Sequence, residues 1–247
     1  YSYGQKAKNT GIISVGASDT TNDLYNIGMA SGFTNGHSPM DSSDTVITPK
    51  YIGEIENAGT INVDGKAGIG LFSTGRGSIA RNTGDIVLNN DNTIGIYADE
   101  GATVYNSGNI RTGRTGLKEV QGVVLGVGSK LHNTGNIVID ADNAAGVKLK
   151  GGTIINEGNI KISDNKSIGM YGAGVGTTVE NKGNILLDGS KAIATNKIGS
   201  LTGVYVDDGA TFRNYGTIKT TDSYAGRNGK VNDNVAGLVL SLIHIWR

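Results

Sequence analysis

The chain has no cysteine, only two prolines, no excess of either charge and no long apolar run. Without cysteine it has neither disulfides nor thiolate metal sites. Lys+Arg and Asp+Glu balance at 22 each, and this zero net charge argues against general nucleic-acid binding, which needs clustered positive charge. No stretch is long and apolar enough to span a membrane. The chain begins Tyr1-Ser2-Tyr3, without Met or a signal peptide, so we expect it to be a piece of a longer protein.

Glycine, by contrast, is abundant, at 40 of 247 residues. There is no Gly-x-y period, and with so little proline the chain is not a collagen. Apolar residues make up 37% of the chain and fall at fixed positions rather than at random. Simple disorder is therefore not expected.

The block Asn-x-Gly-x-Ile recurs seven times in one frame. Its copies begin at Asn57, Asn82, Asn106, Asn133, Asn156, Asn181 and Asn214. Successive spacings are 25, 24, 27, 23, 25 and 33 residues. A period in the twenties is typical of a solenoid. Six of these asparagines follow a glycine by five residues, namely Gly77, Gly101, Gly128, Gly151, Gly176 and Gly209.

A second block follows each asparagine and reads glycine, an aliphatic residue, any residue, and usually another apolar residue. Its copies begin at Gly68, Gly95, Gly122, Gly146, Gly169, Gly203 and Gly237. Each period thus holds three short runs with alternation of period two, which is strand spacing. Glycine at the corners suits backbone angles closed to other residues. The sequence predicts an all-β parallel β-helix of about 7–9 coils, each of roughly 25 residues.

Parity assigns the faces of these strands. The fourth residue after each asparagine is always isoleucine and should be buried: Ile61, Ile86, Ile110, Ile137, Ile160, Ile185 and Ile218. The second residue before it is apolar and should also face inward: Ile55, Ala80, Val104, Leu131, Ile154, Val179 and Phe212. The fifth residue after it varies and should face outward: Asn62, Val87, Arg111, Val138, Lys161, Leu186 and Lys219. The seven asparagines themselves should stack as a hydrogen-bonded structural ladder at a corner.

Three segments follow from this pattern. Residues 1–50 are less regular: Asn9 resembles an anchor, 48 residues before Asn57, so we expect one lost anchor between them. Its place is taken by a polar stretch, residues 30–50, read as a degenerate coil with a protruding loop. Residues 51–240 form the regular coils. Residues 241–247 leave the pattern and are interpreted as an artefactual end of the reading frame.

The Asn-x-Gly-x-Ile, Gly-Ile-Tyr-Ala and Gly-Ala-Thr-Val-x-Asn blocks resemble the passenger repeats of bacterial autotransporters, in particular large fusobacterial outer-membrane adhesins. The resemblance covers about residues 50–240. It implies a right-handed, pectin-lyase-like β-helix, export by the Sec system and a place on the outer face of the outer membrane. Contact with the membrane would be made only through a C-terminal barrel that this sequence lacks. The family offers no catalytic motif for these repeats, and no cofactor is expected.

Tyr97, Tyr171 and Tyr205 share the outward position of the second block. An exposed aromatic stripe can stack on sugar rings or anchor a protein partner, although tyrosine also simply favours strands. Two insertions, residues 189–202 and 221–236, are further candidates, because inserted loops carry much of recognition. The second insertion supplies the remaining predicted binding residues, Tyr224, Arg227 and Lys230.

Catalytic and metal sites are not predicted. Asp64, Asp140 and Asp188 share one position, but they lie on coils that are not adjacent and cannot act as a carboxylate pair. The three histidines, His37, His132 and His244, have no metal-like spacing. The pairs Asp99-Glu100 and Asp207-Asp208 could hold a cation by chance, but both fit solvated corners.

We therefore expect a non-enzymatic, surface-exposed passenger fragment that acts as an adhesin or displays binding loops. Its partner would be a protein or glycan on a host or bacterial surface. The alternatives are a polysaccharide lyase or hydrolase, which would need a catalytic cluster on adjacent coils, and a purely structural stalk.

Overall fold

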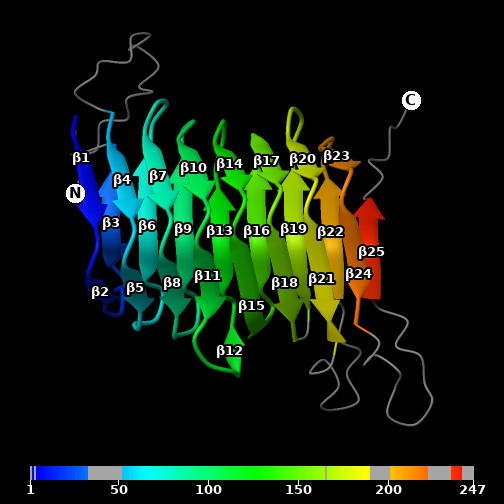
Figure 1. Ribbon diagram of the computed structural model, residues 1–247, viewed down its shortest axis with the longest axis horizontal. Coiled ribbons are helices and arrows are strands. Elements are labelled where there is room, and N and C mark those ends of the chain that lie inside the picture. The colour runs from blue at the N-terminus through cyan, green and yellow to red at the C-terminus, as the bar shows by residue number, and fades with distance from the viewer. Residues whose placement is uncertain are drawn as a thin grey trace.

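The computed structural model describes residues 2, 4–32, 52–164, 166–189, 201–221 and 235–240. These residues wind into a rod of stacked coils, in which three strands per coil contribute to three parallel sheets (Figure 1). Two sheets have eight strands and the third has nine. Seven spacings of about 4.8 Å between neighbouring strands give a rod of roughly 34 Å. The prediction of a parallel β-helix with about 7–9 coils is confirmed, with eight coils.

We name the sheets by their characteristic residues. The asparagine sheet consists of β1 (Lys6–Asn9), β4 (Glu54–Asn57), β7 (Ile79–Asn82), β10 (Thr103–Asn106), β14 (Lys130–Asn133), β17 (Thr153–Asn156), β20 (Thr178–Asn181) and β23 (Thr211–Asn214). The isoleucine sheet consists of β2 (Ile12–Val15), β5 (Thr60–Val63), β8 (Asp85–Leu88), β11 (Asn109–Thr112), β15 (Asn136–Asp142), β18 (Asn159–Ser163), β21 (Asn184–Asp188) and β24 (Thr217–Thr220), with β12 (Leu117–Lys118) beside β15. The tyrosine sheet consists of β3 (Ile27–Ser31), β6 (Ile69–Thr74), β9 (Ile94–Asp99), β13 (Gln121–Leu125), β16 (Ala145–Lys150), β19 (Ser167–Ala173), β22 (Leu201–Asp207) and β25 (Val235–Leu240).

The core is a set of apolar columns that run the length of the rod. Six of the seven repeat isoleucines, from Ile61 to Ile185, are fully buried, and the seventh, Ile218, packs against the core from the last coil. The apolar residues two positions before each asparagine form a second column, which is buried except at Phe212 in the last coil. Since every coil buries its apolar residues against the coils on either side, the stack holds one continuous core.

The asparagine ladder is confirmed and extends over eight residues. Each buried side-chain amide donates to the side-chain oxygen of the next asparagine along the rod. The chain of bonds runs from Asn9 through Asn57, Asn82, Asn106, Asn133, Asn156 and Asn181 to Asn214, with lengths of 2.7–2.9 Å. The bonds satisfy polar groups that the corner would otherwise bury without partners.

The glycines of the repeat have two separate roles. The six glycines that precede the asparagines by five residues all have positive φ, from +74° to +92°, as a corner reserved for glycine requires. The glycine that opens the second block is needed for close approach instead. A Cβ on Gly122, for example, would lie 2.5 Å from the carbonyl oxygen of Gly146 and 2.7 Å from Cγ2 of Ile137.

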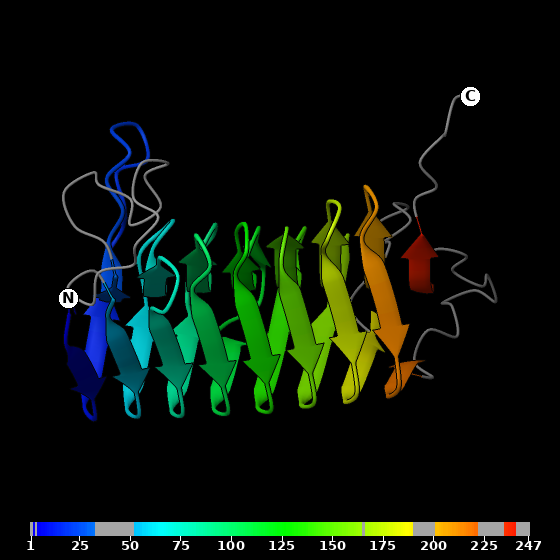
Figure 2. The same cartoon turned by 90° about the horizontal axis from the view of Figure 1, so that it is seen from above.

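The predicted lost anchor between Asn9 and Asn57 is wrong. β1 pairs directly with β4, and the Asn9 amide bonds to Asn57 at 2.8 Å, so the 48 residues form one coil with long insertions. One insertion, residues 16–26, stands off the first coil as the blue loop in Figure 2. The predicted polar loop falls largely on residues 33–51, which lie outside the described residues, as does the tail from 241 to 247.

Two further details differ from the sequence pattern. Val87 was expected to face solvent, but it is only 7% exposed, because the segment around Gly113 packs over it. In the second coil the second block begins at Gly70 rather than Gly68, since Ile69 pairs with Ile94 and Leu71 with Ile96. This shift of two residues moves Phe72 into the column of Tyr97.

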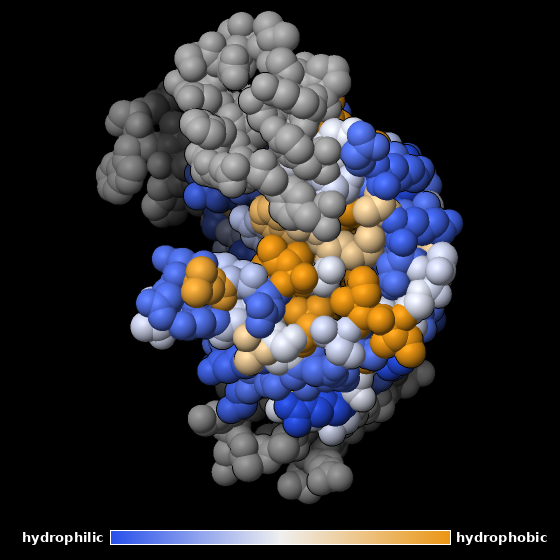
Figure 3. All heavy atoms as spheres, turned by 90° about the vertical axis from the view of Figure 1, so that its left-hand side faces the viewer, coloured by the Kyte–Doolittle hydropathy of each residue, from blue (hydrophilic) through white to orange (hydrophobic). Residues whose placement is uncertain are grey.

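The end of the rod that carries the first coil shows apolar residues at its centre, ringed by hydrophilic ones (Figure 3). Ala7 and Ile13, which belong to this coil, pack on the core yet are only partly buried. Over the described residues no helix is long and apolar enough to cross a membrane.

Candidate functional site

One outward column of the tyrosine sheet carries the predicted tyrosines. Strand register places its members in order along the rod: Ala30, Phe72, Tyr97, Val124, Lys148, Tyr171 and Tyr205. Tyr171 and Tyr205 lie on neighbouring coils, as expected, and each of the three tyrosines is partly buried. The column therefore has two aromatic pairs, which are separated by Val124 and Lys148, and it continues beyond them to Ala30 on one side and Val239 on the other.

The two aromatic pairs have nearly the same geometry. The rings of Phe72 and Tyr97 are stacked with centroids 5.6 Å apart and an interplanar angle of 5°. The rings of Tyr171 and Tyr205 are stacked with centroids 5.6 Å apart and an angle of 15°. Neighbouring strands hold both pairs in place, and such stacks are rigid because a tyrosine or phenylalanine side chain has only two rotatable bonds.

An aspartate accompanies each pair, two residues after one of its tyrosines. The Tyr97 hydroxyl donates to Asp99 at 3.2 Å, and the Tyr205 hydroxyl donates to Asp207 at 3.5 Å. The other oxygen of each carboxylate accepts the backbone N–H of the next residue, at 2.7 Å for Asp99 and 2.8 Å for Asp207. Burial, and then the Asp99 carboxylate, raise the pKa of Tyr97 to about 12. Burial, and then Asp207, raise the pKa of Tyr171 as well. Both phenols therefore stay neutral at physiological pH and remain hydrogen-bond donors.

Three hollows lie along this face and share lining residues. The first, of 450 Å³, is lined mainly by apolar side chains that include Tyr25, Phe72 and Tyr97. The second, of 590 Å³, extends over Val124 and Lys148 and is lined by both Tyr97 and Tyr171. The third, of 390 Å³, shares Lys148 and Tyr171 with the second. All three are within the size range of small-ligand sites. Together they follow the tyrosine column for most of the rod.

Charged residues of both signs line the hollows, and the third hollow has Glu119 as well as Lys148 and Lys166. Acidic residues lie beside each aromatic pair, Asp99 with Glu100 and Asp207 with Asp208. Lys148 and Lys150 lie between the pairs and are exposed. Within the described ranges neither lysine forms an ion pair. The middle of the face therefore offers ammonium donors, and its two ends offer carboxylate acceptors.

The outer face of the asparagine sheet differs, because several of its charged groups are paired with one another. Glu54 bonds to Lys6 at 2.9 Å and to Arg81 at 2.8 Å. The Arg81 guanidinium lies 4.4 Å from the centre of the Tyr105 ring. Further along, His132 bonds to Glu157 at 2.7 Å. The hydrogen bond with His132 is the main reason that the pKa of the Glu157 carboxyl lies below its usual range. These groups stabilise contacts between neighbouring coils, and fewer of their donors and acceptors are left to bind a ligand.

The remaining predicted residues lie elsewhere. Tyr224, Arg227 and Lys230 lie outside the described residues. The seven ladder asparagines form the internal corner described above, so they are structural. The two predicted insertions both connect an isoleucine-sheet strand to a tyrosine-sheet strand, β21 to β22 and β24 to β25, although most of their residues lie outside the described part.

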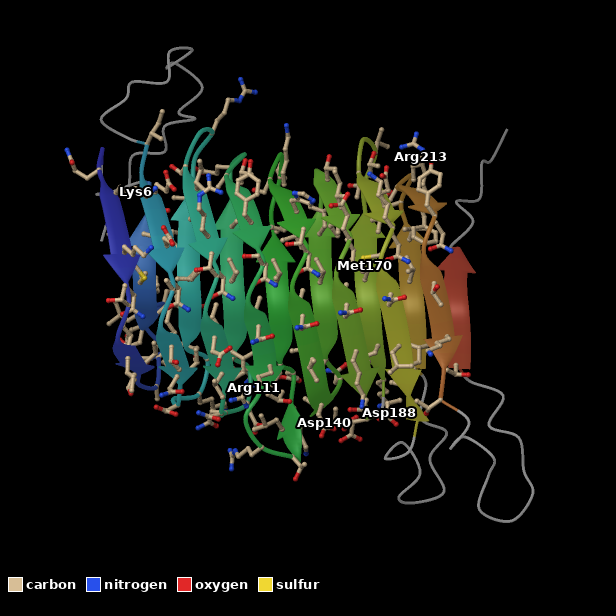
Figure 4. All side chains as sticks on the ribbon, viewed as in Figure 1. Lys6, Arg111, Asp140, Met170, Asp188 and Arg213 are labelled. Carbon is tan, nitrogen blue, oxygen red and sulfur yellow. The ribbon has the colours of Figure 1, made fainter. Side chains whose placement is uncertain are left out.

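Asp64, Asp140 and Asp188, which share one position of the repeat, lie on coils that are not adjacent, as expected. Asp140 in β15 and Asp188 at the end of β21 lie at the same edge of the rod (Figure 4). Ser163 of the intervening coil lies between them in the register. Asp140 accepts from Ser163 at 3.0 Å, and Asp188 pairs with Lys161 at 2.7 Å. Asp64 accepts from Asn89 at 2.7 Å. In the part of the chain that the structure describes, no group of three or more histidine, aspartate or glutamate side chains could hold a metal ion.

Phe72 and Tyr25 were missed at the level of the sequence. The pattern was misaligned by two residues in the second coil, and the 25-residue spacing between Gly70 and Gly95 could have corrected it. Tyr25 belongs to the insertion after β2, where no repeat pattern exists. It is half exposed and lines the first hollow only because that insertion folds beside the tyrosine sheet.

The comparison with known proteins agrees with this architecture. The family model of the BigA third pectate lyase-like domain matches residues 1–109 and, again, residues 91–217. BigA is a bacterial autotransporter-like surface protein. No curated protein and no solved structure is significantly similar to the chain. The two matches together span more than half of the sequence, and the chain belongs to the family of the BigA third pectate lyase-like domain.

Proposed function

We propose that this chain is a binding rod of a bacterial surface protein, without enzymatic activity. It would be an adhesive segment of an autotransporter passenger on the outer face of the outer membrane, related to the fusobacterial adhesins that its repeats resemble. Its partner is a molecule on a host or bacterial surface, and the tyrosine sheet is its binding face.

The observation that carries the proposal is the tyrosine column with its three hollows. Stacked aromatic rings supply a large contact area on a rigid support, and partly buried aromatic residues often dominate binding energy. The other charged face, on the asparagine sheet, uses its groups in contacts between coils. A rod that carries one such face can engage an extended partner at several points, which strengthens attachment without any chemical turnover.

The absence of enzymatic activity is part of the proposal. Glycoside hydrolysis needs two carboxylates across one bond, and lyase chemistry needs a base beside a neutralised acid. The aspartates that share one repeat position instead bond to a serine, a lysine and an asparagine. Incubation with a broad panel of neutral and acidic polysaccharides should release no unsaturated or reducing ends. Release from any of them would mean that the rod is an enzyme.

Attachment to host or bacterial cells tests the binding face. The double variant Tyr171→Ala/Tyr205→Ala should lose most attachment, because it removes one complete aromatic pair. The double variant Tyr105→Ala/Tyr215→Ala removes two exposed tyrosines from outside this face and should attach as the parent does. Circular dichroism should show unchanged β structure in both.

Deletion of residues 190–200 and 222–234, which leaves the strands β21, β22, β24 and β25 whole, tests the loops separately. Lost attachment with intact tyrosines would assign binding to the loops that the sequence analysis favoured. If neither the loop deletions nor the Tyr171→Ala/Tyr205→Ala variant reduced attachment, the chain would be a stalk.

A further inference from the structure

We infer that the tyrosine sheet carries two copies of one binding site for an uncharged sugar, and that a single linear glycan running along the rod occupies both. The first site is formed by Phe72, Tyr97 and Asp99, and the second by Tyr171, Tyr205 and Asp207. This inference rests on the proposed function and names the class of its ligand.

The two sites share sequence as well as geometry. The segment Gly95 to Thr103 reads Gly-Ile-Tyr-Ala-Asp-Glu-Gly-Ala-Thr, and the segment Gly203 to Thr211 reads Gly-Val-Tyr-Val-Asp-Asp-Gly-Ala-Thr. In both segments the tyrosine hydroxyl donates a hydrogen bond to the aspartate two residues later. The tyrosine ring stacks on an aromatic residue of the preceding coil. The coils between Tyr97 and Tyr205 have Val124, Lys148 and Tyr171 in the same column, and none of these three is followed by an aspartate two residues later. The combination is thus a property of two coils and not of the repeat as such.

A ring beside a carboxylate suits a pyranose. The apolar C–H face of the sugar can lie against the aromatic ring, while neighbouring hydroxyls donate to the charged oxygens. An ionised carboxylate offers roughly four acceptor positions. Tyr97 and the backbone N–H of Glu100 occupy two of them on Asp99, and the same arrangement recurs on Asp207. Glycine at position 126 leaves room for this carboxylate, because a Cβ there would collide with Asp99.

The charge at the two ends selects against an anionic sugar. Each site has a second acidic residue next to its aspartate, Glu100 in the first and Asp208 in the second. A carboxylate or sulfate on the sugar would meet two like charges within one site, which is unfavourable. Sugar hydroxyls have no such penalty.

The path between the sites fits one chain. The hollow of 590 Å³ extends from Tyr97 to Tyr171, and its floor carries Val124 and Lys148. The two tyrosines that bond to aspartate, Tyr97 and Tyr205, lie four coils apart, about 19 Å at the usual spacing of paired strands. Lys148 and Lys150 can donate to hydroxyl or ring oxygens along the way. An extended peptide is a poorer fit, since its main chain needs a free strand edge and this surface is the face of a paired sheet.

Calorimetry with neutral linear probes tests the inference. Suitable probes are β-1,4-linked glucose and N-acetylglucosamine chains, a β-1,3-glucan and a mannan, each as a long chain and as its trisaccharide. At least one long chain should bind, at least about tenfold more tightly than its trisaccharide, because the second site is then occupied intramolecularly. Tyr97→Ala or Tyr205→Ala alone should reduce the long chain to the affinity of the trisaccharide. Asp99→Asn and Asp207→Asn, which preserve shape, should weaken binding too, and Tyr215→Ala should have no effect.

Three outcomes would overturn the inference: no neutral chain binds, only an acidic chain such as polygalacturonate binds, or long chain and trisaccharide bind equally well. Its failure can be told apart from failure of the proposed function. If Tyr171→Ala/Tyr205→Ala abolishes cell attachment but periodate oxidation of cell-surface sugars leaves it intact, the face binds a protein and only the ligand class is wrong. If that double variant attaches normally, the binding face itself is wrong.

Discussion

At the scale of single residues, this protein places its polar groups in columns, and burial decides what each column contributes. The structure contains two asparagine ladders of opposite direction. The buried one donates toward the last coil, from Asn57 to Asn82 and onward. The exposed one donates toward the first coil, from Asn184 through Asn159 and Asn136 to Asn109 and finally Asp85. Only the buried ladder must be complete, because water can replace a lost partner in the exposed one.

The two ladders allow a matched test. Asn133→Ala leaves an amide of Asn106 and an oxygen of Asn156 without their partners inside the rod, where the bonds are 2.7 Å long. We expect a loss of about 3 kcal/mol in the free energy of unfolding, measured by urea denaturation. Asn136→Ala breaks two bonds of 2.9 Å in the exposed ladder and should cost less than about 1 kcal/mol. Equal losses in the two variants would contradict a structural role that depends on burial.

Tyr97 offers a test by titration. Its folded-state pKa is raised from 10.0 to about 12, first by burial and then by Asp99. The raised pKa favours the neutral phenol in the folded state. The contribution of Tyr97 to the free energy of unfolding is therefore complete below pH 10 and is lost as pH rises from 10 toward 12. Phenolate absorbance should show late-titrating groups, because burial raises the pKa of both Tyr97 and Tyr171, and Tyr97→Phe should remove the group that titrates last. If the group that titrates last persists in Tyr97→Phe, the largest shift belongs to another tyrosine.

At the scale of the strand, close contact between neighbouring coils requires glycine where the tyrosine sheet begins. One column of the tyrosine sheet consists of glycines, among them Gly70, Gly95, Gly122 and Gly146. Backbone pairing between neighbouring strands is interrupted at this column, because the residues on either side of each glycine are paired and the glycine is not. Each glycine lies against the next glycine's carbonyl group and an isoleucine methyl group of the core. This contact links the tyrosine sheet to the isoleucine sheet, so the binding face depends on it.

Gly122→Ala should therefore destabilise the rod. Its Cβ would approach the Gly146 carbonyl oxygen to 2.5 Å, and backbone there has little freedom to move. We expect a loss of about 2 kcal/mol or more, by urea denaturation, together with weaker ligand binding at the tyrosine sheet. Gly11→Ala is the control, since its Cβ would meet only the Asn9 side-chain oxygen at 4.0 Å. A neutral Gly122→Ala would show that the coils are further apart than the structure indicates.

At the scale of the whole molecule, stability follows from stacking, and each coil depends on those beside it. Ile137 in the fifth coil is fully buried, whereas Ile13 in the first coil and Ile218 in the last are only partly buried. Among the described coils, the first and the last thus have one neighbour fewer and less apolar surface removed from water. Burial of the core therefore increases from the two ends of the rod toward its middle. The two sugar sites lie on coils that have a neighbouring coil on both sides.

Hydrogen exchange should reveal the gradient. Backbone amides of β14, β15 and β16 should exchange more slowly than those of β1 and β2 at one end and of β23 and β24 at the other. Mass spectrometry of peptides from a time course measures this directly. Uniform exchange along the rod would instead mean that all the coils open together as one cooperative unit.

The repeat, the number of strands per coil, the buried columns and the asparagine ladder can all be predicted from the sequence, because each coil must meet the same packing demands and so repeats the same residues. Parity alone also places Tyr97, Tyr171 and Tyr205 on an outer face. The sequence pattern does not show which coils pair across an insertion, as Asn9 and Asn57 do, or which outward positions become covered, as Val87 does. The tertiary structure alone brought Tyr25 beside the tyrosine column and joined Tyr97 to Tyr171 in one hollow. Such contacts depend on register between coils and on where insertions fold, and neither property is periodic along the chain.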